Sequence, residues 1–140
     1  MAKTDAETDW LGRVSLFQQV PRRQLAAIRN SMSERTFNAG DVVVAEGDDE
    51  GRFYLITEGK ATATVNDAAV ATFGPGDYFG EISLIDGGVR TATVRADMAL
   101  QTLTMAPFTF RPILETHPEI SFAILVEMCR RLREADKRQI

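Results

Sequence analysis

One acid and one base lie nine residues apart in a segment that is otherwise rich in apolar residues and glycine. They are Glu81 and Arg90, in "DYFGEISLIDGGVRTATVRA" over residues 77–96. Charged side chains in such surroundings are seldom buried unless something pairs with them. The two could form a structural ion pair with each other, or both could hold a ligand that carries a hydroxyl and an anion.

The residue types around this pair suit a ribose phosphate. The carboxylate of Glu81 can accept hydrogen bonds from sugar hydroxyls, and the planar guanidinium of Arg90 matches phosphate oxygens. A short helix that begins near Gly80 would direct its unpaired N–H groups toward an anion, and a glycine there allows close approach to the backbone. The apolar neighbours would exclude water and strengthen these polar contacts.

The composition argues against several other functions. A chain of 140 residues with a net charge of −4 is the size of one domain and lacks the basic field of a nucleic-acid-binding protein. It has a single cysteine, Cys129, and a single histidine, His117, so we expect neither an internal disulfide nor a Cys/His zinc site. No serine or aspartate is placed to activate either residue, and we therefore expect a protein that is not an enzyme.

The sequence also lacks the signals of membrane insertion or export. No apolar run approaches the roughly 20 residues of a membrane-spanning helix. The first ten residues are polar and acidic, unlike a secretory signal. With one cysteine, the expected location is the reducing cytoplasm.

The elements that must position the pair follow the order helix, strands, helices. Apolar residues at helical spacing predict a helix over 21–32, opened by a proline. Between residues 34 and 105, short β-prone runs separated by turn residues predict an antiparallel sandwich or barrel. The turns Glu58-Gly59 and Asn66-Asp67 predict two β-hairpins within it.

The helical period returns after Pro107 and predicts two helices, over 107–117 and 118–140. Pro112 lies inside the first, which should therefore be short, bent, or begin near that proline. The second carries an apolar stripe made of Ile120, Ile124 or Leu125, Met128 and Leu132. This stripe could pack on its own chain or on the same helix of a second copy.

The segment "FGEISLIDGGVRTATV", residues 79–94, resembles the phosphate-binding cassette of cyclic nucleotide-binding domains. That pattern is Phe-Gly-Glu, an apolar residue, a small residue, Leu, a variable turn, Arg, a small residue, Ala and an apolar strand. The match is nearly complete, with no core residue missing. The resemblance covers about residues 13–135. It implies a mainly β fold of the α+β class: an eight-stranded antiparallel β-roll, jelly-roll-like, with an N-terminal helix, a short cassette helix and two C-terminal helices over about 107–140. The domain would comprise residues 13–140, after a polar segment over 1–12.

The resemblance also implies roles for individual residues. Glu81 would accept the ribose 2′-hydroxyl and Arg90 would pair with the cyclic phosphate. Backbone N–H groups of Ser83 and Ala92, with Gly80 nearby, would complete the phosphate cradle. The implied ligand-binding set is Gly80, Glu81, Ile82, Ser83, Arg90, Thr91 and Ala92. Thr91 could reach the phosphate or the purine, which leaves cyclic GMP open beside cyclic AMP.

The implied function is that of a non-catalytic sensor without metal or cofactor. It would bind a cyclic nucleotide, with cyclic AMP expected first, and residues 118–140 would close over the purine. A partner or a fused effector would respond to the new position of the C-terminal helices. Residues 118–135 could form a homodimer. The alternatives are a preference for cyclic GMP, or an interaction module of the same fold that binds no cyclic nucleotide.

Overall fold

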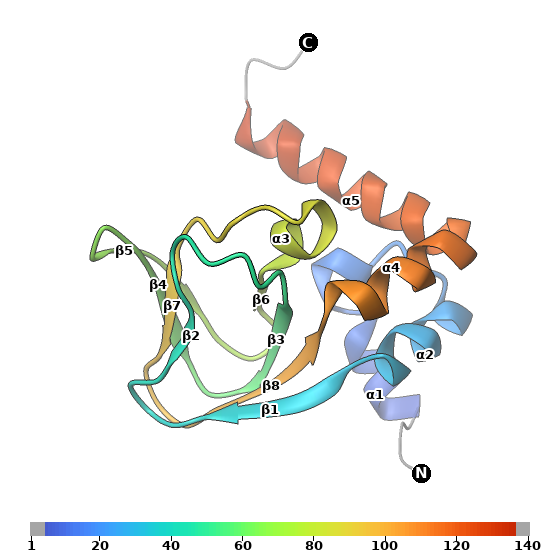
Figure 1. Cartoon of the computed structure of the whole chain (residues 1–140). Helices are drawn as coiled ribbons and strands as arrows, with labels where there is room; N and C mark the ends of the chain where they lie inside the picture. The colour runs from blue at the N-terminus through green and yellow to red at the C-terminus, as the bar shows by residue number, and fades with distance from the viewer. Residues whose placement is uncertain (1–4, 137–140) are drawn as a thin grey trace. The chain divides into compact units, whose positions relative to one another are not determined.

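The computed structural model describes residues 5–136, with side chains described from Thr8 onward (Figure 1). The chain forms two compact units. One is a β unit, Met32–Phe110, and the other is a helical unit made of the residues before Met32 and those from Arg111 on.

The β unit consists of eight antiparallel strands in two four-stranded sheets, which confirms the predicted architecture. The first sheet has the order β1 (Ser33–Phe37), β8 (Leu100–Met105), β3 (Phe53–Glu58), β6 (Tyr78–Phe79). The second has the order β2 (Val42–Val44), β7 (Thr93–Ala96), β4 (Ala61–Val65), β5 (Ala68–Phe73). A short helix, α3 (Glu81–Asp86), follows β6 directly.

One of the two predicted hairpins is confirmed and the other is wrong. Asn66 and Asp67, with φ of 51° and 67°, join the paired strands β4 and β5 in a two-residue turn of the expected kind. The Glu58-Gly59 turn forms no hairpin, because β3 pairs with β8 and β6 whereas β4 pairs with β5 and β7. At Gly59 the connection between β3 and β4 instead passes close to the connection between β7 and β8, where a Cβ would collide with the carbonyl oxygen of Ala99.

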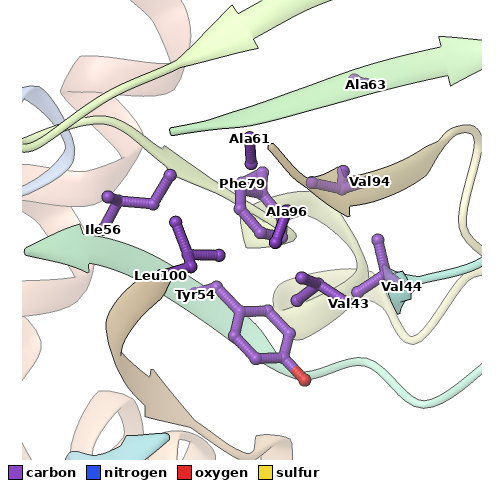
Figure 2. Packing of buried hydrophobic residues seen from close by; sticks show 10 residues of the cluster. All are labelled: Val43, Val44, Tyr54, Ile56, Ala61, Ala63, Phe79, Val94, Ala96 and Leu100. Carbon is purple, nitrogen blue, oxygen red and sulfur yellow. The ribbon is translucent and has the colours of Figure 1, made fainter. Parts of the chain in front are cut away.

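A hydrophobic cluster fills the β unit and fixes the start of the cassette (Figure 2). Its buried members are Val43, Val44, Tyr54, Ile56, Ala61, Ala63, Phe79, Val94, Ala96 and Leu100. The ring of Tyr54 stacks on that of Phe79 at 5.3 Å between centroids. Burying Phe79 contributes roughly 1.5–3 kcal/mol to stability, and the residue directly precedes Gly80. The core therefore determines where the cassette begins.

The helical unit contains the predicted N-terminal helix, α2 (Arg22–Asn30), which buries Leu25 and Ile28. Before it lie α1 (Asp5–Leu11) and a 3₁₀ turn, η1 (Ser15–Phe17). Helix α4 (Pro107–Thr116) begins in the β unit and runs through Pro112 rather than starting there. Helix α5 (Pro118–Ala135) follows, and the last residues predicted for it, 137–140, lie outside the described residues.

The apolar residues of α5 lie on two opposite sides of the helix, so the predicted single stripe is only partly correct. Ile120 and Ile124 are buried as expected, but Leu125 and Leu132 are each 60% exposed. At 3.6 residues per turn, Leu125 comes round to the side opposite Ile120. The buried side also includes the carboxylate of Glu127, which is paired with arginines of the same helix.

Candidate functional site

The β unit contains a cavity of about 290 Å³, and all seven residues predicted from the cassette line it. Its lining is completed by apolar and aromatic residues of both sheets: Val44, Ala63, Val70, Ala71, Phe73, Tyr78, Phe79 and Val94. A mostly apolar cavity with a few converging polar groups is the usual form of a small-molecule site.

Gly80 connects β6 to α3 in a conformation that other residues rarely adopt, with φ of +88°. A Cβ at this position would lie 2.5 Å from the carbonyl oxygen of Arg52 and 2.7 Å from Nη1 of Arg90. A glycine is thus required by the packing of the protein around Arg90, independently of any ligand.

Helix α3 places Glu81 and Ser83 at the cavity, as the short predicted helix requires. It begins at Glu81 and ends at Asp86, its buried Leu84 anchors it, and its C-cap residue Gly87 has a left-handed conformation. The N–H groups of the first helical turn have no carbonyl partner within the helix, so this turn presents hydrogen-bond donors.

Glu81 is half-buried at the cavity wall. Burial raises the pKa of its carboxyl above the ordinary value, while a hydrogen bond from its own backbone N–H and the nearby Arg90 guanidinium oppose part of the rise. A carboxylate in such a place is stabilised by further hydrogen-bond donors, such as the hydroxyls of a sugar.

Arg90 is almost completely buried, with 3% of its side chain exposed. Its Nη2 donates to the carbonyl oxygen of Arg52 and lies 3.6 Å from a carboxylate oxygen of Glu50. Arg90 thus has Glu50 as an ionic partner, in addition to its electrostatic attraction to Glu81. Within the described residues, its buried Nε and Nη1 have no hydrogen-bond partner.

Unsatisfied donors on a permanently charged group are costly in a protein interior. Because this side chain lines the cavity, an anion placed there would satisfy them. The backbone of Arg90 is fixed as well: its N–H donates to Asp48 and its carbonyl accepts from Gly47.

The other predicted residues differ in exposure. Ser83 is buried, Ala92 is half-buried, and Thr91 and Ile82 are exposed. Sequence reasoning did not identify Glu50 or Arg52 at this site, nor the cavity wall formed by β5. No spacing rule links residues 50 and 90, and small apolar residues on β5 carry no functional signal.

Two other kinds of site are not found in the part of the chain that the structure describes. Among the side chains described, from Thr8 to Asp136, no group of three or more His, Cys, Asp or Glu residues could hold a metal ion. None of the helices described is both long enough and apolar enough to cross a membrane.

The similarities of this chain to known proteins agree with the geometry. Residues 34–117 match the family described as cyclic nucleotide-binding domain. The chain is 30% identical over 131 residues to the CRP-like cAMP-activated global transcriptional regulator of Mycobacterium tuberculosis. The aligned region covers 90% of this chain and 58% of that protein. It is 35% identical over 105 residues to the cAMP-dependent protein kinase regulatory subunit of Schizosaccharomyces pombe. Here the aligned region covers 74% of this chain and 26% of that protein.

A solved structure is also similar over nearly its whole length. The N-terminal domain of a transcriptional regulator from Streptomyces coelicolor A3(2) superposes with a TM-score of 0.82 at 37% identity, covering 94% of this chain and 98% of that domain. The two curated relatives are longer, and this chain spans 58% and 26% of their lengths.

Proposed function

The chain belongs to the cyclic nucleotide-binding domain family, and from this premise we propose that it is a non-catalytic sensor that binds a cyclic nucleotide, with cyclic AMP preferred. The observation that carries the proposal is Arg90, a buried cation at the cavity wall with two donor nitrogens that lack partners in the described residues. A cyclic phosphate has one negative charge and acceptor oxygens that suit these donors.

The remaining polar groups of the cavity would hold the rest of the ribose phosphate. The Glu81 carboxylate would accept the 2′-hydroxyl, and backbone N–H groups of Ser83 and Ala92 would donate to the phosphate. Gly80 would hold the turn that brings these groups together, and Ile82 would cover the ligand at the cavity edge.

The purine would lie against the apolar wall that includes Val70, Ala71 and Phe73. Apolar contacts distinguish adenine from guanine only weakly, because they sense shape more than hydrogen-bonding groups. The names of the two curated relatives, which are cAMP-activated and cAMP-dependent, favour cyclic AMP. The hydroxyl of Thr91 is the feature that favours the alternative, cyclic GMP.

The response to the ligand would pass through α3 to the C-terminal helices. A ligand shifts only those states that it binds unequally, so α3 must differ between the free and bound forms. Leu84 is buried and fixed, whereas Ile82 and Ile85 are 64% and 37% exposed and can change partners. The output would be a new position of residues 107–140, which a partner or a fused effector reads.

The exposed side of α5 supports a homodimer through residues 118–135 as part of this proposal. Phe122, Leu125 and Leu132 expose between 60% and 68% of their surface on one side of the helix. Large apolar side chains gathered on one face usually mark an interaction surface. The one cysteine of the chain, Cys129, fits a reducing cytoplasm as the location.

Isothermal titration with cyclic AMP and cyclic GMP tests the function. The protein is first unfolded and refolded to remove co-purified nucleotide, and Arg90→Ala is compared with Arg95→Ala, which removes an exposed arginine of β7. We expect saturable binding that Arg90→Ala weakens strongly and Arg95→Ala preserves, with the nucleotide recovered unchanged. Absence of binding in folded wild-type protein would favour the interaction module instead.

A further inference from the structure

Three arginines surround one carboxylate beside the cavity. The Glu50 oxygens lie 3.6 Å from Nη2 of Arg90, 3.5 Å from Nε of Arg52 and 3.9 Å from Nη1 of Arg35. Glu50 is 45% exposed at its side chain, whereas Arg90 is 3% exposed. The carboxylate thus reaches a buried cation from the surface of the protein.

The fold holds this carboxylate in place from two sides. Arg35 belongs to β1, where its Nη1 also donates to the hydroxyl of Tyr54 at 3.3 Å, and Arg52 directly precedes β3. Both arginines are therefore fixed by strands of the first sheet. The loop itself is confined at Gly51, where a Cβ would lie 2.9 Å from a ring carbon of Pro107.

Glu50 acts on Arg90 through its charge more than through its geometry. The 3.6 Å separation exceeds the usual range of hydrogen bonds between nitrogen and oxygen. The orientation of the guanidinium is set instead by the carbonyl of Arg52, which accepts from the same Nη2. Removing the charge of Glu50 should therefore leave the guanidinium correctly aligned.

We propose that Glu50 is the resident counter-ion of Arg90 and that it weakens the binding of anionic ligands at this site. The inference rests on the proposed function, in which a cyclic phosphate binds Arg90. The phosphate and the Glu50 carboxylate would share one guanidinium, and the two anions repel each other. Whether Glu50 stays or turns into solvent, binding is weaker than it would be without that carboxylate.

The charges of the cluster explain why both anions can be accommodated. Three guanidinium groups face one carboxylate, so one further negative charge leaves the cluster positive. Glu50 therefore stabilises the empty protein by pairing with the buried charge of Arg90, and it lowers the affinity for the ligand without preventing binding.

The test compares Glu50→Gln with Asp49→Asn, which removes the same charge from the neighbouring loop position outside this cluster. We expect Glu50→Gln to bind cyclic AMP about 3–10-fold more tightly by titration at low salt, with a smaller gain at high salt because ions screen the repulsion. Asp49→Asn should change the affinity less than about twofold, as expected for an exposed charge outside the cluster. Without ligand, Glu50→Gln should melt a few degrees lower than wild type, because Arg90 loses its counter-ion.

A second variant covers the case in which Glu50→Gln does not fold. Glu50→Asp keeps the charge but withdraws it by one methylene. It should therefore bind cyclic AMP more tightly than wild type but less tightly than Glu50→Gln would. Unchanged or weaker binding in either folded variant, or an equal gain in Asp49→Asn, would overturn the proposal. If wild type binds no cyclic nucleotide, the proposed function fails, and the melting temperatures without ligand still test the pairing: equal values for Glu50→Gln and wild type would refute it.

Discussion

Gly80 and Arg90 are packed so closely that the glycine cannot carry a side chain while the arginine keeps its position. A Cβ on Gly80 would lie 2.7 Å from Nη1 of Arg90, which is one of the two unpartnered nitrogens that we assign to the phosphate. The turn that begins the cassette helix and the cation of the site are therefore one packed unit.

This packing makes Gly80→Ala a sensitive probe of the site. The substitution imposes a left-handed conformation on alanine and pushes against both the Arg52 carbonyl and Arg90. We expect a loss of about 1–3 kcal/mol in the free energy of unfolding, measured by urea denaturation, and much weaker cyclic AMP binding. Gly76→Ala is the matched control, because Gly76 also has positive φ but nothing lies within 4 Å of the added Cβ. Full binding by Gly80→Ala would contradict this account of the turn.

Arg90 should be required for its shape as well as for its charge. We expect Arg90→Ala to weaken cyclic AMP binding by roughly 2–5 kcal/mol, because a charge-assisted contact to the phosphate is lost. Arg90→Lys should recover only a small part of this, since an ammonium lacks the planar fork and cannot also reach the Arg52 carbonyl. Titration of both variants measures the difference, and wild-type affinity in Arg90→Lys would show that charge alone suffices.

Glu81 should make the protein less stable as the pH rises. Its folded-state pKa lies above the ordinary carboxyl value because of burial, so the folded form binds the proton more tightly than the unfolded form does. The stability that this proton provides is present below the unfolded pKa and is lost as the pH rises through the folded pKa. Glu81→Gln should therefore raise the melting temperature at neutral pH, with a gain that shrinks in acid. A gain that is equal at all pH values would contradict this.

The same residue should control the preference for ribose. Glu81→Ala should bind cyclic AMP more weakly than wild type, because the acceptor for the 2′-hydroxyl is removed. For 2′-deoxy cyclic AMP the two proteins should differ much less, so the variant discriminates less between the two ligands. Competition titrations with both nucleotides measure this ratio, and an undiminished preference for ribose would remove Glu81 from the assigned role.

The exposed side of α5 should determine the oligomeric state. Leu125→Glu places a charge among Phe122, Val126 and Leu132, whereas Met98→Glu changes an exposed apolar residue of the β unit. Sedimentation velocity should show a dimer for wild type and Met98→Glu and a monomer for Leu125→Glu. A monomeric wild type across the accessible concentrations would assign this surface to a different partner.

Features that depend on neighbouring residues could be predicted from the sequence, and features that depend on distant ones could not. The seven cassette residues line one cavity because they belong to one continuous segment, which runs from the Gly80 turn through α3 to the loop before β7. The turn at Asn66 was predictable because its strands adjoin it, whereas Gly59 has a similar turn signature but its flanking strands pair elsewhere. The buried side of α5 could not be identified from the sequence, because the helix is apolar on two sides. Glu50 was missed because its partners lie at positions 35, 52 and 90.

The close approach of Gly51 to Pro107 links the loop that carries Glu50 to the first residue of α4. A ligand that displaces the Glu50 carboxylate from Arg90 would therefore also disturb the start of α4. Different ligand analogues could then fill the cavity with or without changing the position of α4. An analogue that fills the cavity but leaves the pairing of Glu50 intact would bind as an antagonist, and one that breaks the pairing would act as an agonist.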